Sequence, residues 1–104
     1  MKTYYFTITG TSHRYGHKFL EPDMIVKLVK EPDNEYDKEA IKVEIEGIGH
    51  IGYVANSSYT VLGESYSAGR LYDKIGDNVE GKVMYKLPNA VLGKVEVEEG
   101  SEEL

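Results

Sequence analysis

Alternation of apolar and polar residues with a period of two is the feature that most constrains what this chain can fold into. It is clearest in AIKVEIE, residues 40–46. Successive side chains of a β-strand point to opposite faces, so this segment would direct an apolar set inward and a charged set outward. The inward set is Ile41, Val43 and Ile45, and the outward set is Lys42, Glu44 and Glu46. We therefore expect a strand with one face in water.

Other segments share this strand character. They are residues 4–9, 24–30, 50–54, 79–87 and 90–97. In residues 4–9, Tyr4, Phe6 and Ile8 share one face, and Tyr5, Thr7 and Thr9 share the other. Turn-forming residues separate the strands at 47–49, which contain two glycines, and at Pro88 and Asn89. The pattern predicts a mainly β protein with six short strands.

One stretch after the fourth predicted strand has the period of a helix instead. Ala68, Leu71, Tyr72 and Ile75 are spaced i, i+3, i+4, i+7, with Ser67 as a possible N-cap. Residues 56–58 could cap another short helical turn that carries residues 59–62. Six strands with one or two short helices inserted after the fourth predict a small β-barrel, because closure removes exposed strand edges.

Length and composition set the limits of this prediction. At 104 residues without cysteine, the chain has the size of one domain and cannot contain a disulfide or a thiolate metal site. No apolar run suggests a signal peptide or a membrane span, so we expect a soluble, cytoplasmic protein. The net charge is −6, but five of the 18 acidic residues lie in residues 95–104. We expect a single domain over residues 1–97, near neutral in charge, and an acidic, disordered tail over residues 98–104.

Metal binding and catalysis receive little support from the sequence. His13 and His17 are four residues apart, but Gly10 and Gly16 argue against a helix that would align them, and no third ligand has a supporting spacing. The chain also lacks a nucleophile elbow, a phosphate-binding loop and a zinc-protease motif. We therefore expect no enzymatic activity, no metal and no other cofactor.

Residues suited to nucleic-acid binding gather in the predicted loops. Arg14 and Lys38 are suitable phosphate ligands, and Tyr15 and Tyr36 could stack on bases. Asp37 could accept a hydrogen bond from a sugar hydroxyl. Structural roles are the alternative, since both rings could cover the barrel ends and Asp37 could bond to nearby backbone N–H groups. Another polar cluster, GYVANSS at residues 52–58, also follows a predicted strand.

Three successive motifs resemble those of a known family. TITGTSHRYG, KEPDNEYDKEAIKVE and GHIGYVANS are similar, in this order, to the HIRAN domain, and the likeness extends from about residue 6 to residue 86. HIRAN domains occur at the N-terminus of helicase-like SNF2 proteins that remodel replication forks, and as stand-alone bacterial proteins. The resemblance implies an OB-like or SH3-like barrel that captures the 3′ end of single-stranded DNA in repair or replication restart. A helicase or a nuclease would be a suitable partner protein.

The resemblance also implies which residues form the site. The family's Arg-Tyr pair corresponds to Arg14 and Tyr15, and its Asn-x-Tyr-Asp group to Asn34, Tyr36 and Asp37. Tyr53 stands where such members carry His, and Ala55 and Asn56 stand where basic residues follow. The expected nucleic-acid-binding residues are Arg14, Tyr15, Asn34, Tyr36, Asp37, Lys38 and Tyr53.

A non-catalytic protein-interaction module remains the alternative function. Glu31, Asp33, Glu35 and Glu39 surround the expected site, and their repulsion of a polyanion predicts modest affinity for DNA. A positive, aromatic-lined groove would favour nucleic acid, and a negative one would favour a protein partner.

Overall fold

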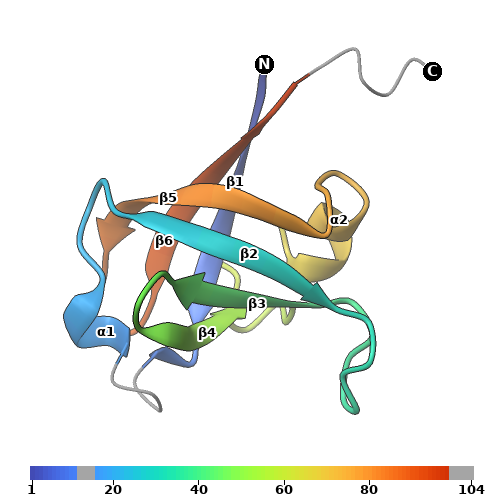
Figure 1. Ribbon diagram of the computed structural model, residues 1–104, viewed down its shortest axis with the longest axis horizontal. Coiled ribbons are helices and arrows are strands. Elements are labelled where there is room, and N and C mark those ends of the chain that lie inside the picture. The colour runs from blue at the N-terminus through green and yellow to red at the C-terminus, as the bar shows by residue number, and fades with distance from the viewer. Residues whose placement is uncertain (12–15, 99–104) are drawn as a thin grey trace.

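Six antiparallel strands form a closed barrel in the computed structural model, which describes residues 1–11 and 16–98 (Figure 1). Around the barrel the strands follow the order β1-β4-β3-β2-β5-β6. Their bounds are β1 Lys2–Thr9, β2 Ile25–Glu31, β3 Ala40–Ile45, β4 Gly49–Val54, β5 Asn78–Lys86 and β6 Val91–Val97. The predicted fold class, a mainly β protein with a small six-stranded barrel, is confirmed. The acidic tail is not tested, because residues 99–104 lie outside the described residues.

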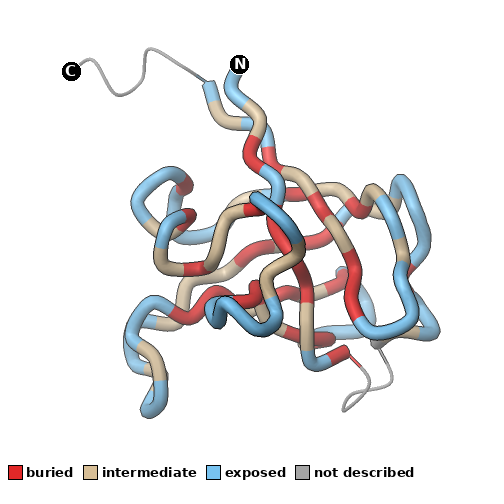
Figure 2. Tube along the Cα trace, turned by 180° about the vertical axis from the view of Figure 1, so that it is seen from behind, coloured by how far each residue is buried: buried red, intermediate tan, exposed pale blue. Residues whose placement is uncertain are grey.

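The barrel interior is filled by the apolar sets that the alternation predicts. Ile41 and Val43 are fully buried, whereas the intervening Lys42 is partly exposed. Buried positions also alternate with more exposed ones along β2, β5 and β6, whereas β1 and β4 each contain consecutive buried residues; buried segments of the chain are red in Figure 2. Gly47 and Gly49 form the turn between β3 and β4 with φ of 85° and 99°, values that glycine adopts without steric cost. Burial of one face of every strand thus explains why these segments form a barrel.

The barrel closes less regularly between β1 and β4 than elsewhere. β1 pairs with β6 from Lys2 to Ile8, but its register with β4 covers only Ile8 and Thr9. The segment after β4 covers the rest of β1: Ala55 N donates to Thr7 O at 2.8 Å, and Tyr66 N donates to Tyr5 O at 2.6 Å. Thr7 is therefore fully buried although it lies on the outward face of β1. Its hydroxyl contacts Ser65 Oγ at 2.9 Å.

The helix expected after the fourth strand is present, as α2, Ala68–Tyr72. Ser67 caps it as predicted, accepting a bond from Arg70 N at 3.3 Å, and Ala68 and Leu71 are buried against the barrel. Lys30 of β2 holds the segment that follows, because its Nζ donates to Ile75 O at 2.7 Å. Residues 57–60, where a second helix was possible, form a turn instead.

A helix also forms between β1 and β2, where the sequence predicted none. This is α1, Gly16–Phe19. The expectation that no helix aligns His13 with His17 is not tested, because His13 lies outside the described residues. A helix this short depends on tertiary packing more than on propensity, and the fully buried Leu20 follows it. His17 Nδ1 lies 3.1 Å from Thr11 Oγ1, which ties α1 to the end of β1.

Candidate nucleic-acid interface

The loop between β2 and β3 is ordered by its own polar side chains. Asn34 Oδ1 accepts hydrogen bonds from the backbone N–H groups of Tyr36 and Asp37 at 2.9 and 3.0 Å. Asp37 Oδ1 in turn accepts one from Glu39 N at 2.9 Å. Side chains of Asn and Asp commonly stabilise turns in this way. The backbone-bonding role considered for Asp37 is therefore real.

Four of the residues expected in the site lie around one hollow. This hollow, the Tyr36 hollow, has a volume of about 420 Å³. It is lined by Asn34, Tyr36, Asp37, Ala40, Tyr53 and Val54. The volume lies within the usual range of small-molecule sites, about 300–1,000 Å³. Tyr36 is 93% exposed, so its ring does not cover the end of the barrel.

Asp37 also connects this loop to the segment after β4. Its Oδ2 accepts a hydrogen bond from Asn56 Nδ2 at 2.7 Å, and Asn56 Oδ1 accepts one from Gly69 N of α2 at 2.7 Å. The loop between β2 and β3 and the helix α2 accordingly lie at the same end of the barrel (Figures 1 and 2). The sequence marked the cluster around Asn56 as polar but did not predict that it would support Asp37.

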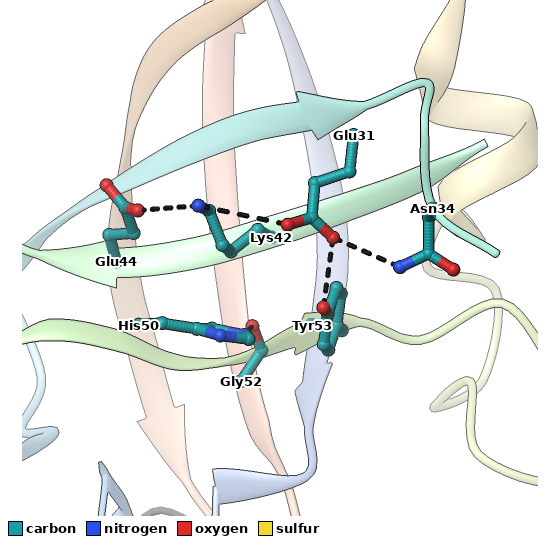
Figure 3. A network of polar contacts seen from close by, with 7 residues as sticks. All are labelled: Glu31, Asn34, Lys42, Glu44, His50, Gly52 and Tyr53. Atoms are coloured by element: carbon teal, nitrogen blue, oxygen red, sulfur yellow. Dashed lines mark hydrogen bonds and ion pairs between the residues drawn. The ribbon is translucent and has the colours of Figure 1, made fainter. Parts of the chain in front are cut away.

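Glu31, at the end of β2, holds two residues of the hollow in place (Figure 3). Its Oε1 accepts hydrogen bonds from Tyr53 Oη at 2.9 Å and from Asn34 Nδ2 at 3.1 Å. Lys42 Nζ lies 3.8 Å from Glu31 Oε2 and 3.0 Å from Glu44 Oε2. Lys42 lies between two carboxylates and is closer to Glu44, so it offsets only part of the charge of Glu31.

The pKa of Glu31 reflects this environment. Partial burial alone would raise the pKa of Glu31. The hydrogen bonds from Asn34 and Tyr53 and the charges of Lys42 and His50 lower it by more than burial raises it, so the pKa is below its ordinary value. The pKa of Lys42 is raised by its hydrogen bond to Glu44, which outweighs the effect of burial. The ion pair and the bonds to Tyr53 and Asn34 therefore favour the ionised carboxylate.

We expect Glu31→Gln to make the free energy of unfolding depend less on pH in the acid range. A carboxylate with a lowered folded-state pKa contributes stability fully above its unfolded pKa, about 4.3, and loses it as the pH falls through the folded value. The stability advantage of the wild type should thus be largest near neutral pH and shrink in acid. Urea unfolding at a series of pH values measures this, with Glu46→Gln, which replaces an exposed carboxylate, as the control. Parallel curves for the wild type and Glu31→Gln would contradict the assignment.

The other expected site residues are placed differently. Lys38 is exposed in the loop but does not line the Tyr36 hollow. Arg14 and Tyr15 lie outside the described residues, so the expected meeting of the Arg-Tyr pair with Tyr36 and Asp37 stays a prediction. Asp37 is the only charged residue that lines the described hollow. The hollow is therefore aromatic but not positive, and it suits stacking and hydrogen bonding more than phosphate binding.

Comparison with known proteins identifies the family. The HIRAN domain model matches residues 1–98, nearly the whole chain. The chain belongs to the HIRAN family. HIRAN domains are DNA-binding modules and in general are not catalytic. No curated protein and no solved structure matches this HIRAN domain.

Two structural observations concern other classes of function. Within residues 1–11 and 16–98, no group of three His, Asp or Glu side chains is placed to hold a metal ion; His13, one of the two spaced histidines, lies outside these residues. Neither helix in the described part of this HIRAN domain is long and apolar enough to cross a membrane.

Proposed function

We propose that this HIRAN domain binds the 3′ end of single-stranded DNA, and that it does so in DNA repair or replication restart, beside a helicase or nuclease partner. The observation that carries the proposal is the Tyr36 hollow. It combines an exposed ring for base stacking, an amide, and a carboxylate at one site of nucleotide size. Arg14, Tyr15 and Lys38 are proposed to contact the phosphates nearby.

Asp37 is proposed to recognise the terminal 3′-hydroxyl. Its carboxylate already accepts bonds from Glu39 N and Asn56 Nδ2. An ionised carboxylate has about four lone-pair sites, so it can accept a further bond from a hydroxyl. The two existing bonds fix its orientation. A 3′-phosphate in the same position would bring a second negative charge against it, and repulsion would weaken binding.

The wild type should therefore prefer a 3′-hydroxyl oligonucleotide over a 3′-phosphate one by roughly tenfold, the effect of one hydrogen bond to a charged group. Asp37→Asn should lose this preference. Fluorescence anisotropy with 5′-labelled oligonucleotides measures both affinities, and thermal unfolding shows whether the variant is folded. Asp33→Asn, in the same loop but outside the lining of the hollow, is the matched control. Equal binding of both ends by the wild type would remove the role of Asp37.

The second candidate function, a protein-interaction module, is favoured by one observation. The single charged residue lining the described hollow is acidic, and the surrounding Asp33, Glu35 and Glu39 are exposed. Such a surface suits a basic peptide. A pull-down from native extract that retains its partner after nuclease treatment, together with no binding to oligonucleotides, would support this function instead.

A further inference from the structure

A second hollow lies beside the first and has the opposite chemical character. This Arg70 hollow has a volume of about 330 Å³. Its lining includes Asn56, Ser58, Val61, Ser65, Ser67 and Arg70. Within the described part of the chain its lining contains one cation and no carboxylate, whereas the Tyr36 hollow contains one carboxylate and no cation. A guanidinium with hydroxyl and amide groups is a suitable set of ligands for phosphate.

One hydrogen bond connects the linings of the two hollows. Asn56 lines the Arg70 hollow and donates one of its two amide N–H groups to Asp37, which lines the Tyr36 hollow, at 2.7 Å. Its Oδ1 accepts from Gly69 N, the residue before Arg70, at 2.7 Å. Asn56 thus joins Asp37 of the Tyr36 hollow to the residue before Arg70, with Glu39 Oε1 beside it, 2.9 Å from where a Cβ atom on Gly69 would lie.

Arg70 is oriented before any ligand binds. Its guanidinium carbon lies 4.3 Å from the centre of the Tyr66 ring, a cation–π contact that restricts the side chain without using its N–H donors. Tyr66 is itself fixed by an edge-to-face contact with the buried Tyr4, with ring centres 5.0 Å apart. The helix carrying Arg70 is anchored by the buried Ala68 and Leu71. The donors thus stay available at a defined place.

An exposed aromatic ring accompanies each hollow. Among the large apolar side chains that the structure describes, Tyr59 and Tyr36 are the most exposed, at 96% and 93%. Tyr36 lines the first hollow; Tyr59 does not line the second, but in the sequence it lies between Ser58 and Val61, which do. Rings this exposed contribute nothing to the core but suit base stacking.

We infer that the Arg70 hollow binds an internal phosphate of the same DNA strand, further to the 5′ side than the phosphate that joins the last two nucleotides, and that Tyr59 stacks on a neighbouring base. The inference rests on the proposed function of the Tyr36 hollow and deepens it. This inference also explains how a hollow lined by a carboxylate can belong to a DNA-binding site, because the negative charge of the phosphate is then neutralised by Arg70 in the neighbouring hollow. The domain then reads a short single strand with its 3′ end at Asp37.

The test is a length series of 5′-fluorescein oligothymidylates with 3′-hydroxyl ends, from the dinucleotide to about eight nucleotides. Arg70→Gln should weaken binding of the longest oligonucleotide by roughly tenfold and lower the salt slope by about 0.7. Tyr59→Ala should weaken it at least about fivefold. The dinucleotide should bind the wild type and Arg70→Gln alike. Lys74→Gln, which removes one charge just after α2 but outside both hollows, is the matched control.

The outcomes separate this inference from the proposed function. If Tyr36→Ala weakens binding but Arg70→Gln matches Lys74→Gln at every length, the Arg70 hollow is not a phosphate site and the proposed function stands. If Arg70→Gln weakens binding and Tyr36→Ala does not, the 3′ end does not bind in the Tyr36 hollow. The inference that one strand occupies both hollows then fails as well. If the wild type binds no oligonucleotide, both are overturned. Thermal unfolding of each variant shows whether it is folded.

Discussion

Tyr36→Ala should weaken binding of a single-stranded 3′-hydroxyl oligonucleotide by about 1–3 kcal/mol, the usual contribution of one base stacked on an aromatic ring. Because the ring is 93% exposed, its removal leaves no cavity in the core. The free energy of unfolding should therefore stay within about 0.5 kcal/mol of the wild-type value. Fluorescence anisotropy measures the first quantity and urea unfolding the second.

Two further variants sharpen this test. Tyr36→Phe keeps the ring and should retain most of the affinity. Tyr85→Ala removes another exposed tyrosine, 61% exposed, on β5 and outside both hollows, and should not change binding. A loss of affinity in Tyr36→Ala that is matched by Tyr85→Ala would show that stacking at this site is not involved. Melting of Tyr36→Ala would mean that the ring supports the fold.

Gly93→Ala should lower the free energy of unfolding by about 1–3 kcal/mol, the usual effect of overpacking a core. A Cβ atom on Gly93 would lie 2.7 Å from Cζ and 2.9 Å from Cε2 of Phe6. Phe6 is fully buried in the centre of the barrel, so its ring cannot move into solvent. Thermal unfolding should show a midpoint lower by roughly 4–8 °C for each kcal/mol lost.

Gly76→Ala is the matched control for this substitution. A Cβ atom on Gly76 would lie 3.6 Å from Val79 Cγ1, an ordinary van der Waals contact. That variant should be about as stable as the wild type. Oligonucleotide binding by Gly93→Ala, measured well below its unfolding midpoint, should be unchanged because Gly93 lines neither hollow. A Gly93→Ala variant as stable as Gly76→Ala would show that the ring of Phe6 can be displaced without cost.

Most of the fold was predictable because its physical cause is local. AIKVEIE alternates over the length of one strand, and the observed β3, Ala40–Ile45, follows it closely. The cap at Ser67 and the apolar spacing from Ala68 predict α2 for the same reason. The burial of Thr7 was not predictable, because it depends on Ser65 and Leu62, which reach β1 from more than 50 residues away along the chain. Nor did local pattern reveal α1, a single turn.

The sequence indicated which residues to look for in the candidate site, but it did not indicate their arrangement. The family motif pointed to Asn34, Tyr36 and Asp37, and the structure brings them together with Tyr53. Glu31, which holds Asn34 and Tyr53, appeared in the sequence only as one more repelling charge. Its role depends on Lys42 and Tyr53, which lie on neighbouring strands.

The sequence by itself determined which segments become strands, where α2 begins, and which loop carries the ring and the carboxylate, because side-chain periodicity, capping and turn chemistry act over a few residues. Only the tertiary structure decided that Asn56 donates a hydrogen bond to Asp37 and that Arg70 lines a neighbouring hollow together with Asn56. Such contacts join residues far apart in the chain, and their distances depend on how the barrel closes, which no local pattern specifies.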